Sequence, residues 1–172
     1  MAIDPAVRPY PVIDVDPHFK RVVSYFRSSD YATWAGLTAM GPAIMYWMET
    51  YMPTKLGASQ IRSAMRTCGG AGLVGGFLYS YCMSSYRFMG FKENAREVQM
   101  DLVEMRARAA SGEPLYGKSL VPDDVQKIAA ANSRNSQLVM SFIPMFNLVN
   151  HNFHGVDTSK YFDQSDKDTK TE

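Results

Sequence analysis

Two long stretches of the chain contain no Lys, Arg, Asp or Glu. They are residues 31–48 (YATWAGLTAMGPAIMYWM) and residues 67–86 (TCGGAGLVGGFLYSYCMSSY). As α-helices they would be about 27 and 30 Å long at 1.5 Å per residue, close to the roughly 30 Å hydrocarbon core of a bilayer. The pattern therefore predicts an all-α membrane protein built around a two-helix transmembrane hairpin over residues 31–87.

Aromatic side chains stand near both ends of the first stretch. Trp34 lies near one end, and Tyr46, Trp47 and Tyr51 lie near the other, where membrane helices concentrate interfacial aromatic residues. Neither stretch is strongly apolar, however, because the first contains Thr, Gly and Pro and the second contains five Gly and several Ser. A hairpin buried in the core of a soluble protein is therefore the alternative.

Small side chains repeat along one face of each predicted helix. In the second helix, Gly72 and Gly76 form a GxxxG pair, the spacing that lets the backbones of two membrane helices approach closely. A matching stripe follows the first helix with a spacing of three and four. We expect these residues to form a helix-packing interface: Ala32, Gly36, Ala39, Ala43, Gly69, Gly72, Gly76 and Ser80.

The region before the hairpin, residues 1–30, is predicted to be an extended arm. Pro5, Pro11 and Pro17 rule out a long helix there. Residues 18–26 (HFKRVVSYF) nevertheless have the apolar spacing of a short interfacial helix, whose basic residues would face lipid headgroups. These basic residues are Lys20, Arg21 and Arg27.

The region after the hairpin is predicted to contain C-terminal amphipathic helices over residues 88–155. One has an apolar stripe within residues 91–109, and a second begins at Pro122 and runs to about Leu138. Residues 156–172 are polar and indicate a solvated tail.

Basic residues on either side of the hairpin favour one orientation. Three precede the first stretch and three follow the second, against three in the link. The excess outside the link predicts both termini on the matrix side. The residues counted are Lys20, Arg21, Arg27, Arg87, Lys92 and Arg96 outside, and Lys55, Arg62 and Arg66 in the link.

The second stretch also contains the spacing of a dinucleotide-binding turn. Gly70, Gly72 and Gly75 read G-x-G-x-x-G, which in a nucleotide-binding fold follows a β-strand and opens a helix. Residues 59–67 (SQIRSAMRT) before it contain no run of β-branched residues. The surroundings favour a helix, so we expect no nucleotide there.

Charge and composition exclude several functions. Lys plus Arg number 18 and Asp plus Glu number 17, so no basic excess points to nucleic acid. His151 and His154 have the spacing of two metal ligands, but no third ligand lies near them in the sequence, and we expect no metal site. Since no nucleophile elbow, phosphate-binding Walker loop or paired-cysteine motif occurs either, the sequence predicts neither a cofactor nor an active site.

Two blocks of the sequence resemble a known family. Residues 10–36 (YPVIDVDPHFKRVVSYFRSSDYATWAG) and residues 142–157 (FIPMFNLVNHNFHGVD) are similar to the N- and C-terminal blocks of the 21 kDa accessory subunit of fungal mitochondrial respiratory complex I, the NADH:ubiquinone oxidoreductase. The resemblance implies a multi-pass, two-span subunit of the mitochondrial inner membrane. It also implies that the chain has no redox centre of its own.

The function expected from this resemblance is structural. The chain would help to assemble or stabilise the membrane arm of complex I, with core and accessory subunits and membrane lipids as partners. Two alternatives are a small soluble NAD-binding oxidoreductase using Gly70 to Gly75, and a Tim17-like translocase component with glycine-rich helices.

Overall fold

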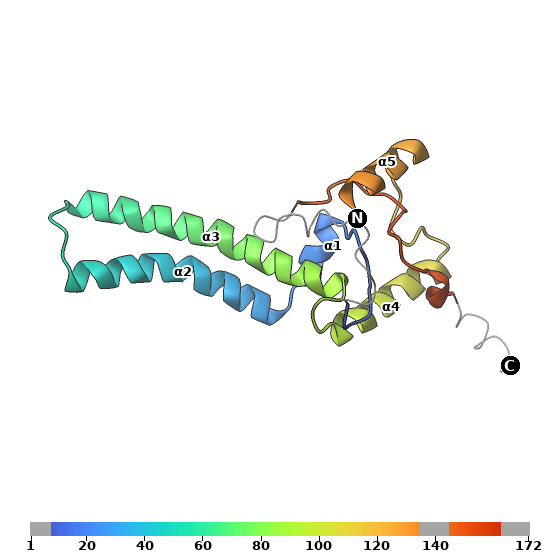
Figure 1. Cartoon of the computed structure of the whole chain (residues 1–172), viewed down its shortest axis with the longest axis horizontal. Coiled ribbons are helices and arrows are strands. Elements are labelled where there is room, and N and C mark those ends of the chain that lie inside the picture. Colours follow the sequence, from blue (N-terminus) through green and yellow to red (C-terminus); the bar gives the residue numbers. More distant parts are fainter. Residues whose placement is uncertain (1–7, 135–144, 163–172) are drawn as a thin grey trace. The chain divides into compact units, whose positions relative to one another are not determined.

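The computed structural model describes residues 8–134 and 145–162, and these residues are helical or irregular (Figure 1). No strand occurs among them, so the all-α part of the predicted class is correct. In chain order the elements are α1 (Phe19–Ser24), α2 (Ser28–Tyr51), α3 (Ala58–Phe88), α4 (Ala95–Ala110), α5 (Asp123–Ser133) and the short 3-10 helix η2 (Ser159–Tyr161).

The chain divides into two units. The hairpin unit comprises Phe26–Ser84 and contains α2 and most of α3. The terminal unit comprises the described residues of Met1–Tyr25 and Ser85–Glu172, so that it combines the two ends of the chain.

The hairpin unit consists of two helices packed side by side. α2 begins after Arg27, whose backbone N–H donates to the Asp30 carboxylate at 2.7 Å and so receives the partner that the helix itself does not supply. Trp34 lies against Gly76, and Gly41 lies against Cys68. Since the contacts ascend along α2 as they descend along α3, the helices are antiparallel.

The predicted transmembrane hairpin is wrong. No helix in the described part of the chain is apolar enough over a sufficient length to cross a membrane. Length is not the limit, because the 24 residues of α2 and the 31 of α3 correspond to about 36 and 46 Å. A stretch without charges still has low hydropathy when it contains many Gly, Ser, Thr and Tyr residues. The predicted orientation, with both termini on the matrix side, assumed two membrane spans and therefore loses its basis.

In the terminal unit, the arm before α1 lies along the end of α3. The backbone N–H groups of Ile13 and Asp14 both donate to the Phe88 carbonyl, at 2.9 and 3.1 Å. Gly90 adopts a positive φ of 78°, and a Cβ atom there would collide with the Tyr10 carbonyl oxygen. Only glycine combines this conformation with so close an approach, so Gly90 fixes the path of the arm.

The terminal unit has an apolar core, and buried polar and charged side chains lie beside it. Val22, Phe88 and Met105 are fully buried. Tyr161 in η2 is also buried and bonds to α4, although it lies in the stretch expected to be a solvated tail. The second predicted helix appears as α5 and ends at Ser133, while its expected continuation over residues 135–138 lies outside the described residues.

Candidate functional site

The small residues predicted on α3 lie against α2. A Cβ atom at Gly69 would be 3.2 Å from the Pro42 ring, and one at Gly72 would overlap the Leu37 carbonyl oxygen. Gly76 is buried against Trp34. Further along, the Ser80 hydroxyl donates to the Asp30 carbonyl at 3.0 Å. These contacts bring the α3 backbone next to the α2 backbone.

The small residues predicted on α2 lie elsewhere. Ala32, Gly36, Ala39 and Ala43 are all exposed, and a Cβ atom at Gly36 would meet nothing within 4 Å. At 100° per residue they occupy the side of α2 opposite the residues that contact α3. The two stripes therefore do not meet each other: α3 packs on larger residues of α2, and the α2 stripe is left uncovered in this chain.

Beside that stripe, α2 exposes a band of large apolar side chains. Trp47 is 60% exposed and Tyr51 is 71% exposed, and their rings lie 5.3 Å apart. The band follows helical spacing, and no charged side chain interrupts residues 31–48. We call this surface the α2 outer face; its large residues are Met40, Ile44, Trp47, Met48 and Tyr51.

The glycine motif at Gly70 to Gly75 lies within α3. It neither follows a strand nor opens a helix, so the strand–turn–helix setting that a dinucleotide requires is missing. Glycine at these positions serves helix packing at Gly72 and leaves open space at Gly70 and Gly75. Nothing in this setting supports an NAD-binding oxidoreductase.

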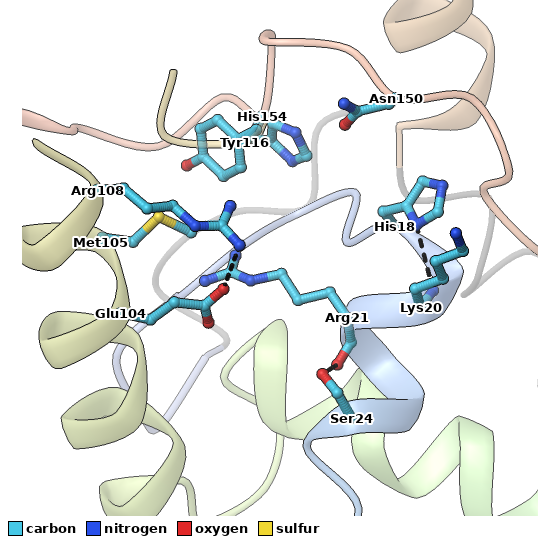
Figure 2. Close-up of a pocket in the computed structure, with 10 residues that line it drawn as sticks. All are labelled: His18, Lys20, Arg21, Ser24, Glu104, Met105, Arg108, Tyr116, Asn150 and His154. Atoms are coloured by element: carbon cyan, nitrogen blue, oxygen red, sulfur yellow. Dashed lines mark hydrogen bonds and ion pairs between the residues drawn. The ribbon is translucent and has the colours of Figure 1, made fainter. Parts of the chain in front are cut away.

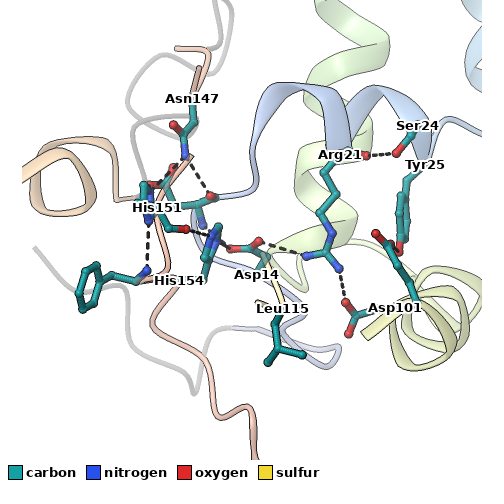
Figure 3. Close-up of polar contacts among 12 residues, drawn as sticks. Asp14, Arg21, Ser24, Tyr25, Asp101, Leu115, Asn147, His151 and His154 are labelled. Carbon is teal, nitrogen blue, oxygen red and sulfur yellow. Dashed lines mark hydrogen bonds and ion pairs between the residues drawn. The ribbon is translucent and has the colours of Figure 1, made fainter. Parts of the chain in front are cut away.

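The terminal unit contains a second candidate site that the sequence did not single out, a buried polar cluster centred on Asp14 (Figure 3). One carboxylate oxygen of Asp14 accepts hydrogen bonds from the Asp16 backbone N–H and from His154 Nδ1, both at 2.9 Å. The other accepts from the Arg21 guanidinium at 3.3 Å. Asp14 is completely buried, so its charge is balanced by partners and not by water.

Arg21 joins Asp14 to α4. Its guanidinium also forms an ion pair with Asp101, and its side chain is 11% exposed. It lies within 6 Å of three aromatic rings, those of Tyr25, Phe88 and Tyr116. Burial alone would lower the pKa of Arg21, but Asp14 and Asp101 outweigh burial and raise it. Arg21 thus packs inward, against the expectation that it faces lipid headgroups.

A parallel set of bonds surrounds Asp16. His151 Nε2 lies 2.8 Å from one carboxylate oxygen of Asp16, which also accepts from the Ser133 hydroxyl at the end of α5. The Asn147 side chain donates to the Asp16 carbonyl at 3.2 Å. Asp16 and His151 lie 135 positions apart in the sequence, so these bonds tie the two ends of the chain together.

Two tyrosines complete the cluster on the α4 side. The Tyr161 hydroxyl donates to Asp101 and the Tyr25 hydroxyl donates to Glu104, each at 2.6 Å. Burial, followed by these hydrogen bonds to carboxylates, raises the pKa of both tyrosines. Both remain neutral donors at physiological pH.

The chemistry of the cluster is that of a structural network. Each histidine bonds to a carboxylate, and the described residues contain no group of three side chains placed to hold a metal ion. Its members come from the arm, α1, α4, α5 and residues 147–161. Moving one of these segments away would break a buried ion pair and leave an uncompensated charge, which costs free energy. The cluster therefore holds these segments in fixed positions relative to one another.

A signal for the cluster was present in the sequence. Asp14 and Asp16 lie in the first block that resembles a known family, and His151 and His154 lie in the second. Neither block predicts by itself that the acids of one meet the histidines of the other, because no periodicity links residues so far apart.

Comparison with known proteins gives consistent matches. Residues 7–93 match the family described as NADH-ubiquinone oxidoreductase complex I, 21 kDa subunit. Residues 102–172 match the family described as the C-terminal of NADH-ubiquinone oxidoreductase 21 kDa subunit. The chain is also 49% identical over 163 residues to the NADH-ubiquinone oxidoreductase 20.9 kDa subunit of Neurospora crassa, and the aligned region covers 95% of this chain and 86% of that relative.

Proposed function

The chain belongs to the family of the 21 kDa subunit of NADH-ubiquinone oxidoreductase complex I, and from this premise we propose that it helps to assemble or stabilise the membrane arm of that complex. The family resemblance expected from the two sequence blocks is thereby confirmed. In this family the chain is a structural subunit and not a catalytic one. The proposed location is the mitochondrial inner membrane, and the proposed partners are core and accessory subunits of the arm together with membrane lipids.

The observation that carries this proposal is the uncovered surface of α2. An uncharged face that combines exposed aromatic and aliphatic side chains is typical of a surface that a partner covers. On the α2 outer face, Trp47 and Tyr51 supply the large amphipathic area that anchors interfaces. A subunit of a large assembly has such partners at hand.

The small-residue stripe of α2 suggests how closely a partner approaches. Gly36 has no neighbour within 4 Å of its Cβ position inside this chain, and the three alanines of the stripe add little bulk. A helix of another subunit can therefore lie against this stripe with its backbone near that of α2. We assign the stripe to contact with a partner helix, and the large residues beside it to the flanks of that contact.

The experiment compares two substitutions at Gly36 in the assembled complex. Gly36→Leu places a side chain where the partner helix would lie, and we expect the subunit to bind about tenfold more weakly. Its retention in the complex on a native gel measures this. Gly36→Ala is the matched control, because it adds only a methyl group, and we expect near-normal retention.

Both variants should leave the isolated chain folded, since the space around Gly36 is open. Circular dichroism of the purified variants checks this, and replacing an exposed helical glycine should raise helix stability by up to about 1 kcal/mol. Wild-type retention of Gly36→Leu in the complex would show that no partner helix lies on this stripe.

A further inference from the structure

The hairpin unit has a distinctive surface at the end where the chain passes from α2 to α3 (Figure 1). Exposed apolar or aromatic side chains and exposed basic side chains occur together there, and none of them belongs to the α2 outer face. We call this surface the hairpin tip. Its residues are Tyr46, Met52, Lys55, Leu56, Arg62 and Arg66.

The hairpin unit carries more positive than negative charge. Phe26–Ser84 contains four basic side chains, two carboxylates and no histidine. Arg27 and Asp30 lie together at the start of α2, so they contribute no net charge. Three bases, all at the hairpin tip, and one acid remain. With each of these exposed groups ionised at neutral pH, the excess is two positive charges.

The remaining carboxylate, that of Glu49, does not pair with these cations. It accepts hydrogen bonds from the Thr54 backbone N–H at 3.0 Å and from the Thr54 hydroxyl at 2.7 Å, so it holds the link against the end of α2. Within the described part of the chain, none of Lys55, Arg62 and Arg66 forms an ion pair. The cations of the hairpin tip are therefore available to an anionic partner.

The apolar members of the hairpin tip are more than half exposed. Met52 is 74% exposed, Tyr46 is 67% exposed and Leu56 is 53% exposed. On α3, Arg62 and Arg66 are four positions apart and share one face of the helix. Long basic side chains can cover apolar surface with their stems while their charges stay in water or among headgroups. Apolar anchors beside unpaired cations are typical of a segment that binds at a membrane interface.

We propose that the hairpin tip binds the headgroup layer of a bilayer that contains anionic phospholipids. The inference rests on the lipid partners proposed above and identifies the surface that contacts them. The negative surface potential of such a bilayer attracts the three basic side chains, while Tyr46, Met52 and Leu56 bury apolar area at the boundary between headgroups and acyl chains. The contact requires no helix to cross the bilayer, and no helix in the described part of the chain is apolar enough to do so.

The test measures cosedimentation of the purified full chain with vesicles of phosphatidylcholine, with or without phosphatidylglycerol as the anionic lipid. We expect tight binding only when phosphatidylglycerol is present. A triple variant, Lys55→Gln with Arg62→Gln and Arg66→Gln, should weaken this binding roughly a hundredfold, because each basic side chain near an anionic surface contributes about fivefold. All three positions are exposed, so the variant should fold, which circular dichroism checks.

A matched control removes three positive charges from exposed positions of the terminal unit. It combines Lys118→Gln and Lys127→Gln with Lys20→Gln, at the pocket drawn in Figure 2, and we expect it to bind as the wild type does. A second variant tests the apolar part of the hairpin tip. Met52→Ser with Leu56→Ser removes two apolar anchors and should weaken binding roughly tenfold.

Each result decides the proposal. Weaker binding of both tip variants, with wild-type binding of the control, supports it. No binding to the anionic vesicles, or equal weakening by the two triple variants, overturns it. Wild-type binding of the Met52 and Leu56 variant also overturns it, because a purely electrostatic contact fits an acidic protein and not a bilayer. Gly36 lies outside the hairpin tip, so the retention of Gly36→Leu in the complex tests the proposed function separately.

Discussion

The hairpin unit and the terminal unit are stabilised in opposite ways. In the hairpin unit, glycines let two helices approach until backbone touches backbone, and Gly72 lies against the Leu37 carbonyl. In the terminal unit, buried carboxylates such as Asp14 are balanced by cations and by neutral donors. One unit depends on shape and the other on charge, so substitutions of different chemistry should damage them selectively.

The largest effect on stability is expected in the terminal unit. Arg21→Gln removes the cation between Asp14 and Asp101, and we expect the free energy of unfolding to fall by roughly 3–5 kcal/mol, the cost of leaving buried charges unpaired. Urea unfolding of the purified chain measures it. Lys20→Gln, one residue earlier and exposed, should change stability by less than about 0.5 kcal/mol. Equal effects of the two variants would show that the terminal unit does not depend on the buried charge of Arg21.

The second-largest effect is expected in the hairpin unit, where the two helices pack closely. Gly72→Ala places a Cβ atom against the Leu37 carbonyl oxygen, and we expect a loss of roughly 2–3 kcal/mol from overpacking. Gly70→Ala on the same helix meets open space and should stabilise the chain by up to about 1 kcal/mol. Thermal unfolding of both variants gives the two changes, and a destabilising Gly70→Ala would show that helix packing does not explain the difference.

A third prediction concerns pH and the terminal unit alone. The pKa of Tyr161 is raised by burial and by its bond to Asp101. The stabilisation from this tyrosine is therefore complete below the unfolded pKa of about 10 and is lost as pH rises above it. Tyr161→Phe should cost about 1–2 kcal/mol at neutral pH and should reduce the further loss of stability above pH 10. Chemical unfolding at pH 7 and above pH 10 compares the two proteins, and identical alkaline profiles would contradict this account.

The smallest effect tests a polar bond inside the hairpin unit. Ser80→Ala removes the hydroxyl that donates to the Asp30 carbonyl, and the expected loss is about 1 kcal/mol. Ser63→Ala, at an exposed position of α3, should stay within about 0.5 kcal/mol of the wild type. A loss comparable to that of Gly72→Ala would mean that the hairpin depends on polar bonds as much as on close approach.

The two units also differ in how far the sequence predicted them. Both helices of the hairpin follow from local periodicity. The same periodicity places Gly72 and Gly76 on one face of α3, because residues three and four apart share a face. The lack of charge predicts membrane insertion, but no helix in the described part of the chain is apolar enough to span a membrane, because many Gly and Ser residues keep the hydropathy low. The cluster around Asp14 was not predicted, because its partner His154 lies 140 positions away.

Arg21 illustrates why the cluster was missed. Its neighbours Lys20 and Arg27 suggested an exposed basic face, and a helical pattern assigns Arg21 to that face equally well. Only the approach of α4, which brings Asp101 alongside, gives this cation a reason to be buried. The sequence assigns residues to faces of one helix, but it does not say which other helix will supply the opposite charge.

The bonds from Asp14 and Asp16 to His154 and His151 set an order of events during biosynthesis. The histidines are made 135 and 140 residues after the carboxylates that they bind, so the terminal unit cannot close until synthesis has passed His154. α2 and α3 can pair well before that, since contacts between near neighbours in sequence form fastest. A product released before His151 would keep the complete hairpin, but Asp14 and Asp16 would lack their histidine partners. These unpaired carboxylates would give cellular quality control a direct way to recognise an incomplete subunit.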